Sequence, residues 1–156
     1  MASNGDMIPR ALRGVASLFS ITAATLMITA RQRTTSHVYF GDLAPYWYFV
    51  FANFTIAGYS ALLICLPSKS QLWRFAVALD LILTVIIFSS CSAALAVGSM
   101  ESKGNPHAGW LPICHTFPIY CFRVFLAIGI GFFGSLIYVM LQLLCIQEAF
   151  NSILLD

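Results

Sequence analysis

Four apolar stretches, each about 20 residues long, fill most of this 156-residue chain. They run over about residues 11–30, 46–66, 75–97 and 124–145. A helix needs about 20 apolar residues to cross the roughly 30 Å hydrocarbon core of a bilayer. None of the four stretches alternates apolar and polar residues as the strands of a membrane barrel do. The pattern predicts an all-α integral membrane protein, folded as a four-transmembrane-helix bundle.

The charge content agrees with this fold class. Only 9% of the residues are charged, whereas a soluble domain typically has about 25%. The formal net charge of +2 is small and scattered, and no arginine-rich arm or zinc-finger spacing is present. We therefore expect no nucleic-acid partner. We predict a single membrane domain over residues 1–156, with outer loops at about 31–45 and 98–123 and with membrane lipids as its surroundings.

The first apolar stretch has one alternative interpretation. Arg10 and Arg13 precede an apolar run, as in a cleaved signal peptide. However, the run is long, and Ile28 occupies the position where a small residue would be needed for cleavage after Ala30. We expect the stretch to be retained as the first span.

Lysine and arginine do not decide the topology, because equal numbers flank the spans on each side. One side has Arg10, Arg13, Lys69 and Arg74, and the other has Arg31, Arg33, Lys103 and Arg123.

Two cysteines in the longest connection give the topology instead. Cys114 and Cys121 are close in sequence, and such a pair outside the spans indicates a disulfide in an oxidising compartment. This predicts that the loop is extracellular and that both termini are cytosolic. Two alternatives remain: two unpaired thiols, or a metal site formed by Cys114 with His107 and His115, for which the ligand spacing is not standard.

Two opposite charges lie inside the apolar stretches. Arg13 is near the start of the first stretch and Asp80 is a few residues into the third, so both lie at similar depth. A charge in hydrocarbon is costly and usually faces a partner, and the guanidinium fork binds a carboxylate bidentately. We predict an intramembrane ion pair. The alternative is that Arg13 extends to lipid phosphate while Asp80 is protonated.

Small residues recur every four positions in three of the spans, which allows close approach of helices in lipid. This spacing leaves open whether the faces pack within one protomer or between protomers. The residues are Ala16, Ser20 and Ala24 in the first span, Ser90, Ala94 and Gly98 in the third, and Ala127, Gly131 and Ser135 in the fourth.

The aromatic residues of the second and fourth spans lead to a different expectation. Phe132, Phe133 and the run from Tyr46 to Phe49 suit lipid-facing and interfacial positions.

The sequence has no recognisable catalytic grouping. Outside the spans there is no Ser/His/Asp combination, paired carboxylates, phosphate-binding glycine loop or metal-ligand set, and Asp42, Glu101 and Glu148 are isolated in sequence. Broken helices and internal repeats, which are typical of transporters, are also not visible. We expect a protein that is not an enzyme and needs no cofactor.

Four short segments of the chain together resemble the plant Casparian strip membrane domain protein-like family, whose members are four-span relatives of the MARVEL proteins. They are Ala11-Leu12-Arg13, Leu79-Asp80-Leu81, Gly104-Asn105 and the run from Trp110 to Arg123. In that run the family pattern is Trp, Ile-Cys, an aromatic residue, and an aromatic-Cys pair often followed by Arg. The resemblance covers the whole chain. The loop 31–45 lacks the short signature of the true Casparian strip members, so the chain is similar to the "-like" members.

The resemblance implies a multi-pass plasma-membrane scaffold that assembles with itself and with related proteins. In such assemblies the family forms lateral diffusion barriers and recruits wall-modifying enzymes. Trp110, Phe117 and Arg123 would form the outer-loop motif, with the two aromatic rings available to a partner or to the outer leaflet. Two other functions remain open: a small channel or transporter subunit with Arg13 and Asp80 along its path, or an accessory subunit of a larger membrane complex.

Overall fold

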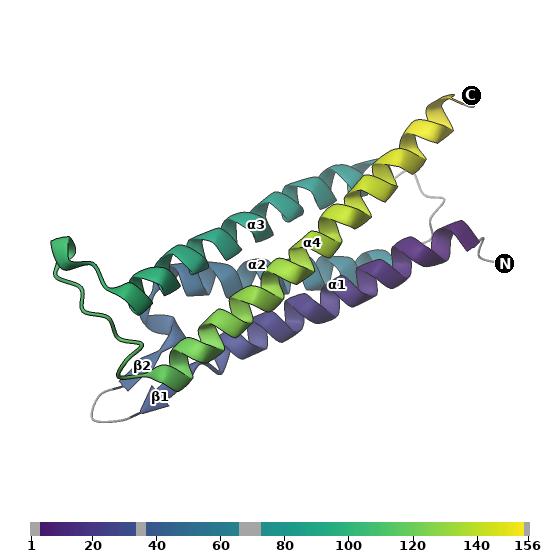
Figure 1. Ribbon diagram of the computed structural model, residues 1–156. Helices are drawn as coiled ribbons and strands as arrows, with labels where there is room; N and C mark the ends of the chain where they lie inside the picture. The colour runs from purple at the N-terminus through teal and green to yellow at the C-terminus, as the bar shows by residue number, and fades with distance from the viewer. Residues whose placement is uncertain (1–3, 34–36, 66–72, 155–156) are drawn as a thin grey trace.

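The computed structural model describes residues 4–33, 37–65 and 73–154. Within these ranges the chain forms four long helices, each long and apolar enough to cross a membrane (Figure 1). They are α1 (Asn4–Ile28), α2 (Ala44–Cys65), α3 (Trp73–Lys103) and α4 (Pro118–Leu154). The predicted all-α four-span fold is confirmed.

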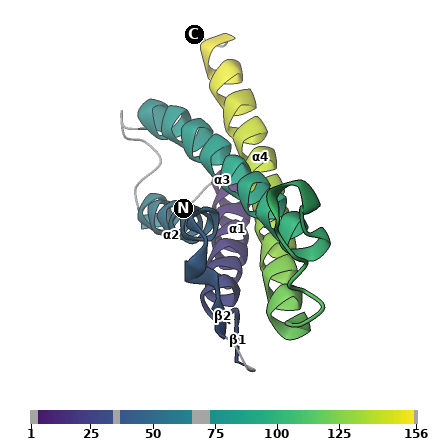
Figure 2. The same cartoon turned by 90° about the vertical axis from the view of Figure 1, so that its left-hand side faces the viewer.

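Each helix packs against its neighbours in sequence, and α4 also packs against α1, so the four helices close into an up-down bundle. Figure 1 shows that α1 begins and α4 ends at the same end of the bundle, which we call the terminal end. In Figure 2 the other end of the bundle faces the viewer. The opposite end, which we call the loop end, has the connections from α1 to α2 and from α3 to α4. In this arrangement α1 and α3 face each other across the diagonal.

The helices extend beyond the apolar stretches that predict them. α3 continues to Lys103 and α4 already begins at Pro118, so the predicted outer loop 98–123 shortens to 104–117. The reason is that backbone hydrogen bonding carries a helix past the hydrocarbon region, whereas an apolar window ends at the first polar residues. Leu66, where the second span was predicted to end, and Lys69 lie outside the described residues.

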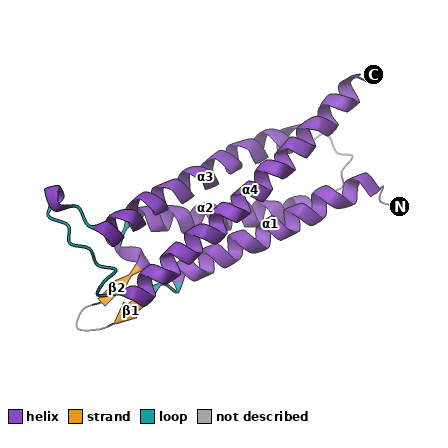
Figure 3. Ribbon diagram, in the orientation of Figure 1, coloured by secondary structure: helices purple, strands orange, loops and turns teal. Residues whose placement is uncertain are grey.

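The first connection contains a small hairpin that the sequence analysis did not predict (Figure 3). Strand β1 (Arg31–Arg33) pairs antiparallel with β2 (His37–Tyr39), and Arg31 lies opposite Tyr39. A short 3₁₀ helix, η1 (Phe40–Asp42), leads into α2, and a second, η2 (Pro106–Ala108), lies in the second connection. Three-residue strands carry too little periodicity to stand out in a sequence.

The small residues pack inside the protomer. All of the small residues named above are buried: Ala16, Ser20, Ala24, Ser90, Ala94, Gly98, Ala127, Gly131 and Ser135. At Gly131 an added Cβ would lie 2.8 Å from Cζ of Phe49, and at Gly134 it would lie 3.1 Å from Cβ of Phe19. The small-residue faces of α1 and α4 therefore serve helix packing within the bundle.

The expectation for the aromatic residues is wrong in part. Tyr46 and Phe49 are fully buried, and Phe132 packs against the core. Trp47 is partly exposed, and Phe133 is 65% exposed, as a lipid-facing residue would be. The difference arises because α2 packs against both α1 and α3, so only part of its aromatic surface faces outward.

Candidate functional site

Arg13 and Asp80 meet inside the bundle, on the side of the terminal end. Arg13 Nη1 donates to Asp80 Oδ1 at 2.8 Å, and Nη2 donates to Oδ2 at 2.6 Å. The two residues are only 4% and 5% exposed. The two parallel hydrogen bonds match the guanidinium fork to both carboxylate oxygens. This ion pair joins α1 to α3 across the diagonal of the bundle.

A chain of hydroxyl groups lies beside the ion pair. Ser17 Oγ donates to the carbonyl oxygen of Arg13, and the Tyr138 hydroxyl lies 3.3 Å from Ser17 Oγ and 2.9 Å from Ser60 Oγ. These three side chains come from α1, α2 and α4. Together with the ion pair they form a polar layer through all four helices, which we call the Arg13–Asp80 layer.

The buried ion pair gives this layer a structural role. Both carboxylate oxygens of Asp80 accept a hydrogen bond from the Arg13 guanidinium, and both side chains are buried in the protein. Such a pair offsets the desolvation of both ions, and removal of one partner would leave the other charge buried. The layer therefore specifies which helix faces meet.

A second polar cluster lies at the loop end, centred on Glu101. The Glu101 side chain is 7% exposed. Its Oε2 accepts a hydrogen bond from the Tyr46 hydroxyl at 2.5 Å, and its Oε1 accepts one from the Tyr120 hydroxyl at 3.1 Å. Glu101 thus links α3 to α2 and α4. Although Glu101 is isolated in sequence, the fold brings two tyrosines to it from other helices.

One signal in the sequence could have identified Glu101. Ala94 and Gly98 are buried on α3, and Glu101 follows them at the i+7 and i+3 positions of the same helix face. Reading the helix beyond the end of the apolar stretch would have placed this carboxylate toward the core.

The second connection is held by a disulfide and by the Glu101 backbone. Cys114 and Cys121 form a disulfide, and the N–H groups of Ile113 and Cys114 donate to the Glu101 carbonyl oxygen at 2.9 and 3.4 Å. The structure thus contains the pairing that the cysteine spacing indicates, and the sulfur of Cys114 is not available to a metal. Among the described residues no group of three or more metal-ligating side chains occurs.

The three residues of the outer-loop motif have different environments. Trp110 is 49% exposed and pairs its backbone with that of Asn105. Phe117 is only 7% exposed and belongs to the core, so the expectation that its ring is available to a partner is wrong. Its burial follows from its position directly before α4. Arg123 is exposed and donates from Nη1 to the carbonyl oxygen of Thr29 at 2.8 Å, near the end of α1.

The role of Gln32 is not predicted by any pattern in the sequence. Its Oε1 accepts hydrogen bonds from the N–H groups of Ile119 and Tyr120, both at 3.1 Å. These groups lie in the first turn of α4, where backbone N–H groups have no partner within the helix. Gln32 therefore caps α4 and attaches the hairpin to it, through a contact of two segments that no local motif predicts.

Four membrane-spanning helices, joined through a buried ion pair and closed at one end by a disulfide-bonded loop, define a small multi-pass membrane protein. A family model described as the Casparian strip membrane protein domain matches residues 2–137. The chain therefore belongs to this family, as the resemblance in sequence predicts.

Curated relatives match over most of their own length. CASP-like protein 1C1 of Arabidopsis thaliana is 40% identical over 142 residues, covering 88% of this chain and 87% of the relative. CASP-like protein 1C2 of Vitis vinifera is 40% identical, covering 90% and 91%, and CASP-like protein 1C3 of Populus trichocarpa is 37% identical, covering 92% and 86%. No solved structure matches. The family description names a membrane protein domain and indicates no catalytic function.

Proposed function

We propose that this protein is a non-enzymatic scaffold of the plasma membrane, which self-assembles into oligomers or membrane domains with copies of itself and with related proteins. Such an assembly would act as a lateral diffusion barrier and would recruit extracellular wall-modifying enzymes. Membership of the Casparian strip membrane protein domain family supports a role within the membrane. In this proposal both termini are cytosolic and the disulfide-bonded loop faces the wall.

The main observation in support of this proposal is that Arg13 and Asp80 are buried and bonded to each other. A channel or transporter that used these charges would hold them against a watery path, where an ion or proton could exchange with them. Instead, both residues are about 95% buried and bonded to each other through two hydrogen bonds. This geometry favours a rigid structural unit over a conducting one.

Lateral mobility in the plant plasma membrane tests the proposal directly. A fluorescent fusion of the full chain should recover slowly after photobleaching, because an assembly of many copies diffuses more slowly than a single four-helix unit. Recovery at least tenfold slower than that of an unrelated monomeric four-span protein is expected. Rapid and complete recovery would contradict self-assembly.

Flux through proteoliposomes separates the scaffold from its rival in a different class. The purified chain should give no ion flux above that of empty liposomes. Flux that is present for the natural chain and lost in Asp80→Asn would favour the channel instead. Co-isolation of an unrelated membrane protein at fixed stoichiometry would favour an accessory subunit.

A further inference from the structure

The two buried carboxylates of the bundle differ in one respect. Asp80 has an arginine as its partner, whereas the hydrogen bonds that Glu101 accepts from described side chains come from the neutral hydroxyls of Tyr46 and Tyr120. Among the side chains that the structure describes, no positively charged one forms an ion pair with Glu101. Buried charges in proteins are usually paired with an opposite charge. Glu101 therefore has no cationic partner among the described residues.

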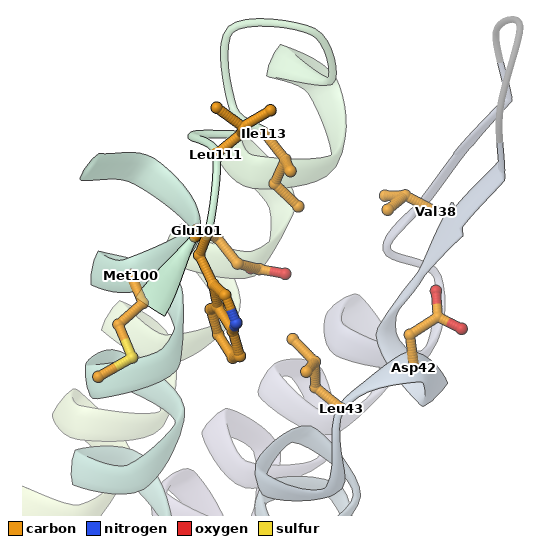
Figure 4. Close-up of a pocket in the computed structure, with 9 residues that line it drawn as sticks. Val38, Asp42, Leu43, Met100, Glu101, Leu111 and Ile113 are labelled. Carbon is orange, nitrogen blue, oxygen red and sulfur yellow. The ribbon is translucent and has the colours of Figure 1, made fainter. Parts of the chain in front are cut away.

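Glu101 also lines a pocket at the loop end, which we call the Glu101 pocket (Figure 4). Its volume is about 380 Å³, within the range of sites for small organic ligands. Figure 4 shows the Glu101 carboxylate directed toward the side of the pocket formed by Val38 and Leu43. The apolar lining residues are Val38, Leu43, Met100, Trp110, Leu111 and Ile113.

The charge of the pocket has one sign. Asp42 is the second ionisable residue in its lining, and none of the described residues that line it is a lysine, arginine or histidine. Both Glu101 oxygens already accept one hydrogen bond, and a carboxylate offers about four acceptor positions in total. The carboxylate can therefore accept further hydrogen bonds from a donor inside the pocket.

We propose that the Glu101 pocket binds an apolar molecule with a single protonated amine. The ammonium group would donate to the free acceptor positions of Glu101, and Asp42 would add a second negative charge at the same pocket. The apolar body would lie against residues such as Met100 and Leu111. A hydrogen bond between two charged groups is about twice as strong as a neutral one.

The lining argues against an inorganic cation or an anion as the occupant. A metal ion such as Ca²⁺ takes six to eight oxygen ligands, whereas six of the nine residues that line this pocket have apolar side chains. An organic anion would meet two carboxylates and, among the described lining residues, no positive charge. The site lies between the hairpin with η1 on one side and the end of α3 with its following loop on the other, apart from the Arg13–Asp80 layer.

Three probes with nearly the same apolar body test the proposal: 2-phenylethylammonium, neutral 2-phenylethanol and anionic 3-phenylpropanoate. Their binding to the full chain in nanodiscs is measured by isothermal titration calorimetry, with empty nanodiscs subtracted and potassium chloride constant. The Kd of the cation should be at least tenfold lower than that of either other probe. Equal affinities, or tighter binding of the anion, would overturn the proposal.

Two variants test whether the cation binds at the Glu101 pocket. Glu101→Gln should reduce the preference for the cation to within twofold, while Glu148→Gln, the same charge change near the end of α4, should leave it unchanged. Because Glu101→Gln alters contacts with two tyrosines, a second variant uses the 81% exposed Leu111. Leu111→Arg brings a competing cation to the pocket and should weaken phenylethylammonium binding at least tenfold. Binding of the natural strength by Leu111→Arg would overturn the proposal, whether or not Glu101→Gln folds.

Discussion

At the scale of single residues, we expect the stability of the bundle to depend strongly on the buried ion pair. Asp80→Asn removes one charge and leaves the Arg13 guanidinium buried, 4% exposed, with no anionic partner among the described residues. We expect the free energy of unfolding to fall by about 3–5 kcal/mol. Unfolding of the purified chain in mixed micelles, titrated with a denaturing detergent, measures the change.

A double variant serves as the matched control for the ion pair. Arg13→Met with Asp80→Leu removes both charges and fills a similar volume with apolar groups. Such replacements of a buried ion pair often leave the stability unchanged or raise it. The double variant should therefore be more stable than Asp80→Asn. If it is less stable than the single variant, then Arg13 contributes through contacts other than the ion pair.

Gly131 gives a second prediction at the residue scale. An added Cβ would lie 2.8 Å from the ring of Phe49 and 3.3 Å from Sγ of Cys91, both fully buried. Gly131→Ala should therefore lower the free energy of unfolding by about 1–3 kcal/mol through overpacking. At Gly129, on the same helix, an added Cβ meets nothing within 4 Å. Gly129→Ala should leave the stability unchanged or raise it slightly, and an equal loss in both variants would contradict the argument.

At the scale of elements, the loop between α3 and α4 depends on a covalent link. The disulfide joins residues seven positions apart, and closure of so short a loop stabilises a fold by about 2–3 kcal/mol through the unfolded state. Cys114→Ser with Cys121→Ser should lower the free energy of unfolding by this amount. The same detergent titration measures it.

Alkylation with peptide mass spectrometry tests the link in the natural chain. After denaturation without reductant, Cys114 and Cys121 should remain unlabelled, whereas the free thiol of Cys91 should label fully. Labelling of both loop cysteines under these conditions would show that the disulfide is absent.

The element scale also shows where prediction from the sequence succeeds and where it ends. Long apolar runs identify all four helices, because crossing hydrocarbon requires internal hydrogen bonding over about 20 residues. The hairpin β1–β2 and the cap that Gln32 provides to α4 escape prediction. The hairpin escapes because its three-residue strands are too short to show a period. The cap escapes because Gln32 and the start of α4 are far apart in the chain.

At the scale of the whole molecule, the bundle separates two ends with different chemistry. The terminal end has the first residues of α1 and the last of α4, and the loop end has the disulfide. Because disulfides persist in oxidising compartments, we expect an epitope inserted next to Ala108 to be labelled by antibody on intact cells. An epitope at either terminus should be labelled only after permeabilisation. Labelling of a terminal epitope on intact cells would reverse the topology.

The sequence by itself determined the fold class, the family and the chemical types of the ion pair and the disulfide, because apolar length, rare intramembrane charges and cysteine spacing are properties of the chain. Only the tertiary structure decided that the small-residue faces pack within the protomer and that Phe117 lies in the core. It also decided that Glu101 lies between two tyrosines beside an apolar pocket. The physical reason is that burial and pairing depend on which helix faces meet, and those faces come from segments that are distant in sequence.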